Sequence, residues 1–334
     1  MFSKIKDQNQ SYRNLVNGEW KESTSGKFIE IKSPIDQSFL GRVPTMTTAE
    51  VDEVIAYAKT AQVEWKNKTT SERAKVLYKA ADLLEEHIEE LAKIMMMEIA
   101  KDSKSCRSEI SRTADFIRFS ADSAKNMSGE SIPGDSFPGF KNNKISIVKR
   151  EPLGIVLAIS PFNYPVNLAA SKIAPAVVIG NAVILKSATQ GTLCGLHLAR
   201  IFEAAGLPKG ILNTVTGKGS EIGDYITTHK EINFINFTGS TEVGQRISKE
   251  TTMTPLLMEL GGKDAAIILE NADLEHAASN IISGAFSYSG QRCTAVKRVL
   301  VVDSVADRLV SLLREKMAGL KVGNPMETEA LDVV

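Results

Sequence analysis

A nucleophile, a general base and a hydrogen-bond donor, which together could act on a carbonyl compound, have candidates that stand far apart in this sequence. Cys293 lies in the stretch YSGQRCTAV, behind a Gly-Gln-Arg run and next to Arg292. A nucleophilic cysteine needs exposure and an electropositive neighbourhood that favours the thiolate, and an arginine beside a turn could supply both. A small buried hydrophobic residue is the alternative for any single cysteine, and it is the expected state of Cys106 and Cys194.

A general base and an oxyanion donor have one candidate each. The four histidines stand in unrelated contexts, so a carboxylate is the expected base, and Glu259 precedes a Gly-Gly turn in MELGGKDAAIILE. Partial burial between Met258 and Leu260 would raise its pKa toward a useful range, whereas an ordinary edge-strand glutamate is the alternative. Asn163, in ISPFNYPVNLA, could donate its amide to a developing oxyanion beside the Cys293 N–H, or could be a simple turn asparagine.

Two loops could hold a nucleotide. In FTGSTEVG a strand runs into Gly239 and Ser240 at a helix start, where backbone amides attract phosphate. The strand NAVILK ends at Lys186, and Thr189 follows in SATQG. FTGSTEVG fits neither G-x-G-x-x-G nor a Walker A loop, so an ordinary strand-to-helix turn remains its alternative. For the second stretch the alternative is a helix cap by Thr189.

The elements that must position these residues can be predicted from apolar spacing. Helical spacing runs through residues 50–65 and, as one further helix, through 74–100 before continuing in 108–124. Residues 127–150 are rich in glycine, proline and serine and predict an excursion with an exposed strand pair, which would either meet another subunit or form a plain surface hairpin. After Gly154, short apolar strands alternate with helices, which is typical of a parallel sheet with its ligand site beyond the carboxyl ends of the strands.

Composition narrows the function classes. Forty basic and forty acidic side chains give no net charge in 334 residues, so bulk electrostatics favour neither nucleic acid nor an anionic membrane as a partner. No stretch reaches the roughly 18 apolar residues of a membrane span, the first residues resemble no signal peptide, and three scattered cysteines fit neither a disulfide framework nor a zinc site. We expect a cytoplasmic protein.

The motifs PFNYP, FTGST, ELGGK and GQRC, in this order, resemble the aldehyde dehydrogenase superfamily. The resemblance extends from NLVNGEW near the N-terminus to GNP near the end. It implies an α/β fold with a Rossmann-like parallel-sheet NADP-binding domain over residues 1–260, which carries an oligomerisation hairpin at about 127–150. Residues 261–334 would be the N-terminal part of an α/β catalytic domain that is incomplete here.

The resemblance also implies roles for the candidate residues. Cys293 matches the nucleophile of the family, Glu259 its general base and Asn163 its oxyanion donor, and the chemistry needs no metal. The positions that match cofactor contacts are Pro161, Lys186, Thr189, Gly239 and Ser240. The family departs from the usual glycine fingerprint, so the missing G-x-G-x-x-G is no objection.

The stretches AISPFNYPVNLAASKIAPA and YSGQRCTAVKRVLV further resemble the non-phosphorylating glyceraldehyde-3-phosphate dehydrogenases, a subfamily. This implies a phosphorylated aldehyde whose phosphate is held by Arg112, Tyr164 and Arg292, although Arg112 alone would be assigned to a solvated helix face. Relatives that prefer NAD commonly carry glutamate where Thr189 stands, so the expected cofactor is NADP. Ser187 and Ala188 depart from the pattern, because relatives usually have proline at the first of these positions.

The sequence stops at Val334, part-way through the expected catalytic domain. A Glu-x-Phe-Gly-Pro segment, a further arginine for the substrate phosphate and a terminal strand are expected in the family and are not found. The full-length protein would form a tetramer that acts on a small aldehyde. Two alternatives stay open, namely another NAD(P)-dependent aldehyde dehydrogenase, for lactaldehyde or a semialdehyde, and an inactive truncated nucleotide-binding fragment.

Overall fold

A computed structural model describes residues 1–136, 138–139 and 143–334 of the chain. Its main body is built on a parallel sheet of five strands in the order β11-β10-β7-β8-β9. The strands are β7 (Ile155–Ser160), β8 (Ala182–Ser187), β9 (Leu212–Thr214), β10 (Phe234–Thr238) and β11 (Leu256–Glu259). The predicted α/β class and parallel sheet are confirmed.

The central strands β7 and β8 are apolar over their first four residues because the sheet has a core on each face. Along β7, Val156 and Ala158 join one cluster of buried side chains, and Ile155 and Leu157 join the other. Successive side chains of a strand point to opposite faces, so a sheet covered on both sides needs a continuous apolar run.

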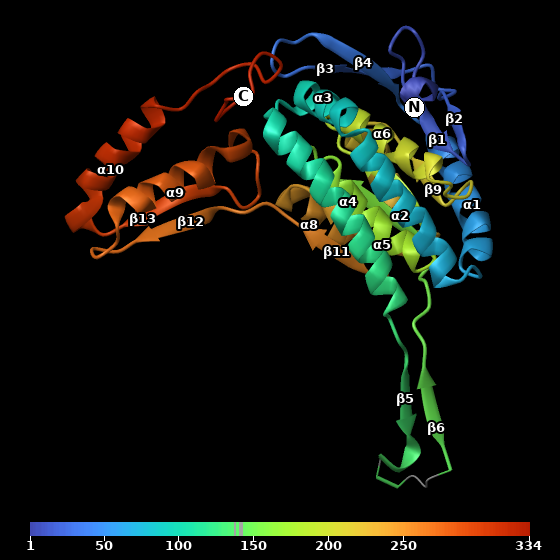
Figure 1. The fold of residues 1–334 in the computed structure, drawn as a ribbon. Helices are drawn as coiled ribbons and strands as arrows, with labels where there is room; N and C mark the ends of the chain where they lie inside the picture. The colour runs from blue at the N-terminus through green and yellow to red at the C-terminus, as the bar shows by residue number, and fades with distance from the viewer. Residues whose placement is uncertain (137, 140–142) are drawn as a thin grey trace.

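Helices cover both faces (Figure 1). The larger core is closed by α2 (Thr70–Glu86), α3 (Ile88–Ile99), α4 (Ser103–Lys125), α5 (Asn167–Val178) and α6 (Thr192–Ala204). The second core is closed by α1 (Thr48–Trp65), α7 (Asp224–Thr227) and α8 (Thr241–Glu250). Thr47 and Thr69 form capping boxes with Glu50 and Glu72, which fixes where α1 and α2 begin.

The prediction of one helix over residues 74–100 was wrong. The backbone leaves helical geometry at His87, where φ is −108° and ψ is 24°, and this residue separates α2 from α3. The apolar spacing continues across the break because both helices bury their faces in the same core. Spacing alone therefore did not reveal it.

Short antiparallel pairs surround this body. Near the N-terminus they are β1 (Asn14–Val16) with β2 (Glu19–Lys21) and β3 (Phe28–Lys32) with β4 (Phe39–Pro44). The predicted strand pair at 127–150 is confirmed as β5 (Glu130–Pro133) with β6 (Ile145–Val148), which projects from the body in Figure 1. Its tip at residues 137 and 140–142 lies outside the described residues. On β6, the side chains of Ile145 and Ile147 are 70% and 71% exposed.

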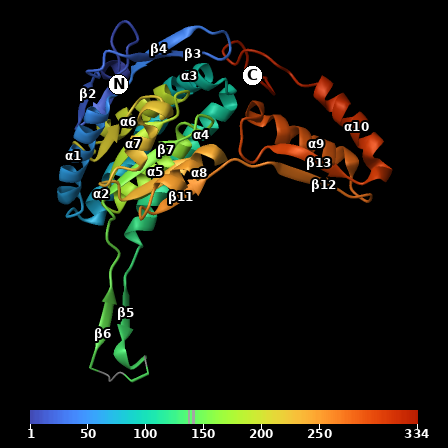
Figure 2. The ribbon, with the colours of Figure 1, turned by 180° about the vertical axis from the view of Figure 1, so that it is seen from behind.

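The last part of the chain forms a smaller lobe, joined to the body after β11 (Figure 2). It contains the parallel pair β12 (Asp264–Ile268) and β13 (Val296–Val301), with α9 (Leu274–Phe286) and α10 (Asp303–Ala318). Ile268, Ala278 and Leu309 form its own small core. No helix in the described part of the chain combines the length and apolarity needed to cross a membrane.

Candidate active site

The candidate residues of the sheet converge on one edge of it. Lys186 lies near the end of β8, and Glu259 is the last residue of β11. Asn163 follows β7, and Gly239 follows β10. These four strands are parallel neighbours, so their carboxyl ends meet at the same edge, which is where open α/β sheets bind ligands.

A cavity of about 510 Å³ lies over this edge, and we call it the sheet-edge cavity. Its lining includes all the residues predicted to contact a cofactor, namely Pro161, Lys186, Thr189, Gly239 and Ser240. Ser240 is the N-cap of α8, and its hydroxyl accepts a hydrogen bond from the Val243 N–H at 3.2 Å. The alternative in which Thr189 caps a helix is wrong, because α6 takes Gly191 as its N-cap. Thr189 lines the cavity instead.

Lys186 brings a buried positive charge to the sheet-edge cavity. Burial lowers its pKa, and its Nζ makes no hydrogen bond to another group in the described part of the chain. Since Lys186 lines the cavity, an anionic or hydroxyl-bearing ligand there would supply a hydrogen-bond partner for Nζ. The residues present thus fit a nucleotide.

A second cavity, of about 660 Å³, adjoins the first, and we call it the thiol cavity. Cys293, Glu259 and Asn163 all line it. Asn163 and Thr238 line both cavities, so a ligand in one lies next to a ligand in the other. The structure therefore brings the predicted nucleophile, base and oxyanion donor to one place.

Cys293 is the exposed thiol among the three cysteines, whereas Cys106 and Cys194 are buried as expected. It follows a 3₁₀ turn, Ser287–Gly290, in which Tyr288 (φ 56°), Ser289 (φ 55°) and Gly290 (φ 73°) are left-handed. This conformation is uncommon for residues other than glycine and costs about 1–3 kcal/mol each. The thiol thus stands at the cavity wall three residues after a strained turn.

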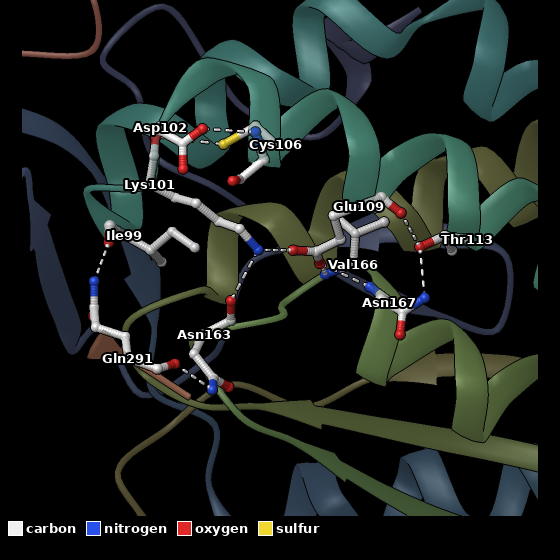
Figure 3. A network of polar contacts seen from close by, with 11 residues as sticks. Ile99, Lys101, Asp102, Cys106, Glu109, Thr113, Asn163, Val166, Asn167 and Gln291 are labelled. Atoms are coloured by element: carbon white, nitrogen blue, oxygen red, sulfur yellow. Dashed lines mark hydrogen bonds and ion pairs between the residues drawn. The ribbon is translucent and has the colours of Figure 1, made fainter. Parts of the chain in front are cut away.

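Asn163 points its carboxamide toward Gln291, which directly follows this turn (Figure 3). Its Nδ2 donates to the carbonyl oxygen of Gln291 at 2.6 Å. An amide nitrogen carries two hydrogens, so one remains for an oxyanion. The contact also ties the loop after β7 to the segment that carries Cys293.

The expectation that Glu259 is partly buried was wrong, because its side chain is exposed. The reason is that β11 is the outermost strand of the sheet, so the edge-strand alternative describes its position. Its Oε2 accepts a hydrogen bond from Thr238 Oγ1 at 3.1 Å. Glu259 is therefore an edge-strand residue that also lines the thiol cavity.

Two residues that the sequence did not suggest, Lys172 and Thr238, form a hydrogen-bonded chain to Glu259. Lys172, on α5, donates from Nζ to Thr238 Oγ1 at 2.7 Å, so Thr238 lies between Lys172 and Glu259. Burial lowers the pKa of Lys172 to about 8, partly opposed by the negative charge of Glu259. Thr238 stands within the quoted motif FTGST, so it was the more accessible of the two to sequence reasoning.

The three predicted phosphate ligands are not all in one place. Arg112, exposed on α4, and Tyr164 line the thiol cavity. Burial, together with Tyr288, raises the pKa of Tyr164. Arg292 lies outside the cavity lining, because its Nη2 donates to the Gly284 carbonyl oxygen at 3.1 Å and its guanidinium lies 5.3 Å from the centre of the Tyr288 ring. Its buried Nε has no hydrogen-bond partner in the described residues.

Several known proteins are similar to this chain in sequence and fold. The sequence profile of the aldehyde dehydrogenase family matches residues 20–333. An NADP-dependent glyceraldehyde-3-phosphate dehydrogenase of Streptococcus equinus is 52% identical over 334 residues, and the match covers 97% of this chain and 70% of that protein. The enzyme of the same name from Zea mays is 48% identical, with 97% and 65% covered.

Among solved structures, the NADP-dependent glyceraldehyde-3-phosphate dehydrogenase of Bacillus halodurans C-125, crystallised as a complex with NADP, superposes with a TM-score of 0.93 at 52% identity. The match covers 96% of this chain and 67% of that one. The chain thus spans about two thirds of the length of its relatives.

Proposed function

Because this chain belongs to the aldehyde dehydrogenase family, we propose that it carries the site that oxidises glyceraldehyde 3-phosphate to 3-phosphoglycerate with NADP. The observation that supports this most is the pair of adjoining cavities, which share Asn163 and Thr238 at their junction. One cavity contains residues suited to a nucleotide, and the other contains an exposed thiol, a carboxylate and an amide donor.

The sheet-edge cavity would hold the nucleotide. Lys186 would bind its ribose or the additional phosphate, and the start of α8 beyond Gly239 and Ser240 would lie near the pyrophosphate. Thr189 introduces no negative charge that would repel a 2′-phosphate, which favours NADP over NAD. When bound, NADP supplies the hydride acceptor for the reaction.

Residues that line the thiol cavity would carry out the covalent steps. The Cys293 thiolate attacks the aldehyde carbon, and the oxyanion of the resulting thiohemiacetal accepts hydrogen bonds from Asn163 Nδ2 and the Cys293 N–H. After oxidation, Glu259 removes a proton from a water molecule, which attacks the thioester and releases the acid and the thiol. The exposed position of Glu259 gives it access to that water.

The substrate phosphate would contact Arg112 and Tyr164, which line the same cavity as Cys293. Guanidinium groups bind phosphate oxygens through paired charge-assisted hydrogen bonds. Arg292 would join them once its side chain leaves the Gly284 carbonyl, and its unpartnered Nε is then available to the phosphate.

We assign residues 1–260 to an NADP-binding domain with the hairpin at about 127–150, and residues 261–334 to the first part of a catalytic domain. The five-stranded sheet ends with Glu259, and β12 pairs with β13, which supports that division. We further propose a cytoplasmic protein whose full-length form is a homotetramer. The exposed apolar side chains of β6 support its pairing with another subunit.

The first experiment measures NADPH formation with glyceraldehyde 3-phosphate in the absence of inorganic phosphate. Wild type, Cys293→Ser and the control Cys194→Ala are compared, because Cys194 is buried on α6 and lines neither cavity. Turnover that Cys293→Ser abolishes and Cys194→Ala retains supports the proposal. Turnover that survives in Cys293→Ser, or that is equally efficient with unphosphorylated glyceraldehyde, contradicts the proposed nucleophile or substrate respectively.

A further inference from the structure

A buried ion pair lies directly behind the loop that carries Asn163. The chain ends α3 with Ala100 in a left-handed conformation (φ 50°, ψ 58°), and Lys101 follows before α4 begins at Ser103. Lys101 Nζ pairs with a carboxylate oxygen of Glu109, and each side chain is only 1% exposed. A buried charge pair is expensive to desolvate, so its position calls for a reason other than stability.

One side of this pair fixes the helix that follows Asn163. The second carboxylate oxygen of Glu109, Oε1, accepts hydrogen bonds from the backbone N–H groups of Val166 at 3.0 Å and Asn167 at 2.9 Å. These groups lie at the start of α5, where an acceptor and a negative charge are both favourable. Lys101 Nζ also donates to the carbonyl oxygen of Asn163 itself at 3.3 Å (Figure 3).

The other side of the pair reaches the segment that carries the thiol. The Lys101 ammonium lies 4.0 Å from the centre of the Tyr164 ring and 4.4 Å from that of Tyr288, which precedes Cys293 in the turn. Cation–π attraction is strongest where the cation is desolvated. Gln291 adds a second link, because its Nε2 donates to the Ile99 carbonyl at 3.3 Å while its own carbonyl accepts from Asn163.

We propose that Lys101 and Glu109 are positioning residues that hold the Asn163 amide and the Cys293 turn in register with each other. The ammonium binds the Asn163 backbone and both tyrosine rings, and the carboxylate fixes the ammonium and the start of α5. Neither group is assigned contact with the reacting atoms. The inference rests on the proposed function where it predicts a change in kcat. Its prediction for the alkylation rate of the Cys293 thiol does not depend on that function.

The kinetic experiment is a double-mutant cycle between Lys101→Met and Asn163→Ala, read as kcat and kcat/KM. Misplacing a reacting group by about 1 Å costs roughly 100-fold, so we expect Lys101→Met to lower kcat by about 10- to 100-fold. In the Asn163→Ala background, the same change should cost at least about 3-fold less than in the wild type, because the amide is absent and only the setting of the Cys293 turn is left to disturb. An equal loss in both backgrounds would mean a general structural effect and overturns the proposal.

Two further variants keep the result interpretable. Lys59→Met is the matched control, since Lys59 pairs with Glu231 at 2.6 Å but is exposed on α1 and lines neither cavity. It should leave kcat unchanged. If Lys101→Met does not fold, the variant Lys101→Met/Glu109→Gln removes both charges and leaves no unpaired one. It enters the cycle in its place, with the same expected loss of kcat.

A readout without turnover separates this inference from the proposed function. The alkylation rate of Cys293 by iodoacetamide reports the setting of the turn, because Cys106 and Cys194 are buried. We expect Lys101→Met to change this rate by at least about 3-fold and Lys59→Met to leave it at the wild-type value. A change in a protein without aldehyde oxidation supports positioning while the proposed function fails. Equal rates in wild type and Lys101→Met overturn the positioning role whatever the enzyme does.

Discussion

Replacing Lys172 with methionine should change how the stability of the protein depends on pH. Lys172 is 2% exposed, and burial lowers its pKa from 10.5 to about 8. In the unfolded chain the side chain regains its ordinary pKa. Between pH 8 and about 10.5 the unfolded state therefore binds more protons than the folded state, and the stability of the wild type rises with pH across that window.

The size of the effect follows from the two pKa values. Each pH unit between them corresponds to about 1.4 kcal/mol, so the protonated lysine costs the folded state about 3 kcal/mol below pH 8. Methionine is similar in length and carries no charge. Lys172→Met removes that cost but also the hydrogen bond to Thr238, which contributes about 1 kcal/mol. At pH 7 the variant should thus be more stable by about 2 kcal/mol.

The assay is urea unfolding at fixed protein concentration, followed by the fluorescence of Trp20 and Trp65 at pH 7, 8, 9 and 10. The free energy of the variant minus that of the wild type cancels the titration of all other groups. This difference should fall by about 2.5 kcal/mol between pH 7 and 10. The exposed Lys79→Met is the control. A difference that stays constant with pH refutes the assignment of a depressed pKa to Lys172.

Three further outcomes are expected. Arg112→Ala should raise the KM for glyceraldehyde 3-phosphate by about 10- to 100-fold, the loss of a charge-assisted hydrogen bond, and leave the KM for unphosphorylated glyceraldehyde unchanged. Thr189→Glu should lower kcat/KM for NADP relative to NAD by about tenfold or more through charge repulsion, and a constant ratio would place the 2′-phosphate elsewhere. Glu98→Ala should lower the free energy of unfolding by about 2–4 kcal/mol, measured in urea, because it leaves the buried N–H groups of Leu193 and Cys194 without their acceptor; a loss below about 1 kcal/mol would contradict this.

The parallel sheet was predictable because burial on both faces forces continuous apolar runs. Ile155 through Ala158 must all be apolar, and no helix of that length would need this. The break at His87 was not predictable, since the two helices share one buried face and the spacing stays in phase. Local geometry, and not hydrophobicity, ends α2.

Candidate residues within short motifs were found, whereas those defined by tertiary contact were not. Asn163 follows a predicted strand and Cys293 follows a Gly-containing turn, so their positions at a strand end and in a loop could be predicted. Nothing near Lys172 in the sequence indicates that its ammonium reaches Thr238, 66 residues away. The orientation of Arg292 is likewise set by the Gly284 carbonyl and Tyr288, which its neighbours in the sequence do not reveal.

The division of the site between two parts of the chain has a consequence for synthesis on the ribosome. The residues that line the sheet-edge cavity lie between Ile159 and Val243, and the sheet is complete once Glu259 has been made. Domains fold as units, with N-terminal ones first. The nascent chain can therefore assemble the sheet, Asn163 and Glu259 before Cys293 emerges. The Cys293 thiol then meets a finished cavity wall as soon as its own segment folds.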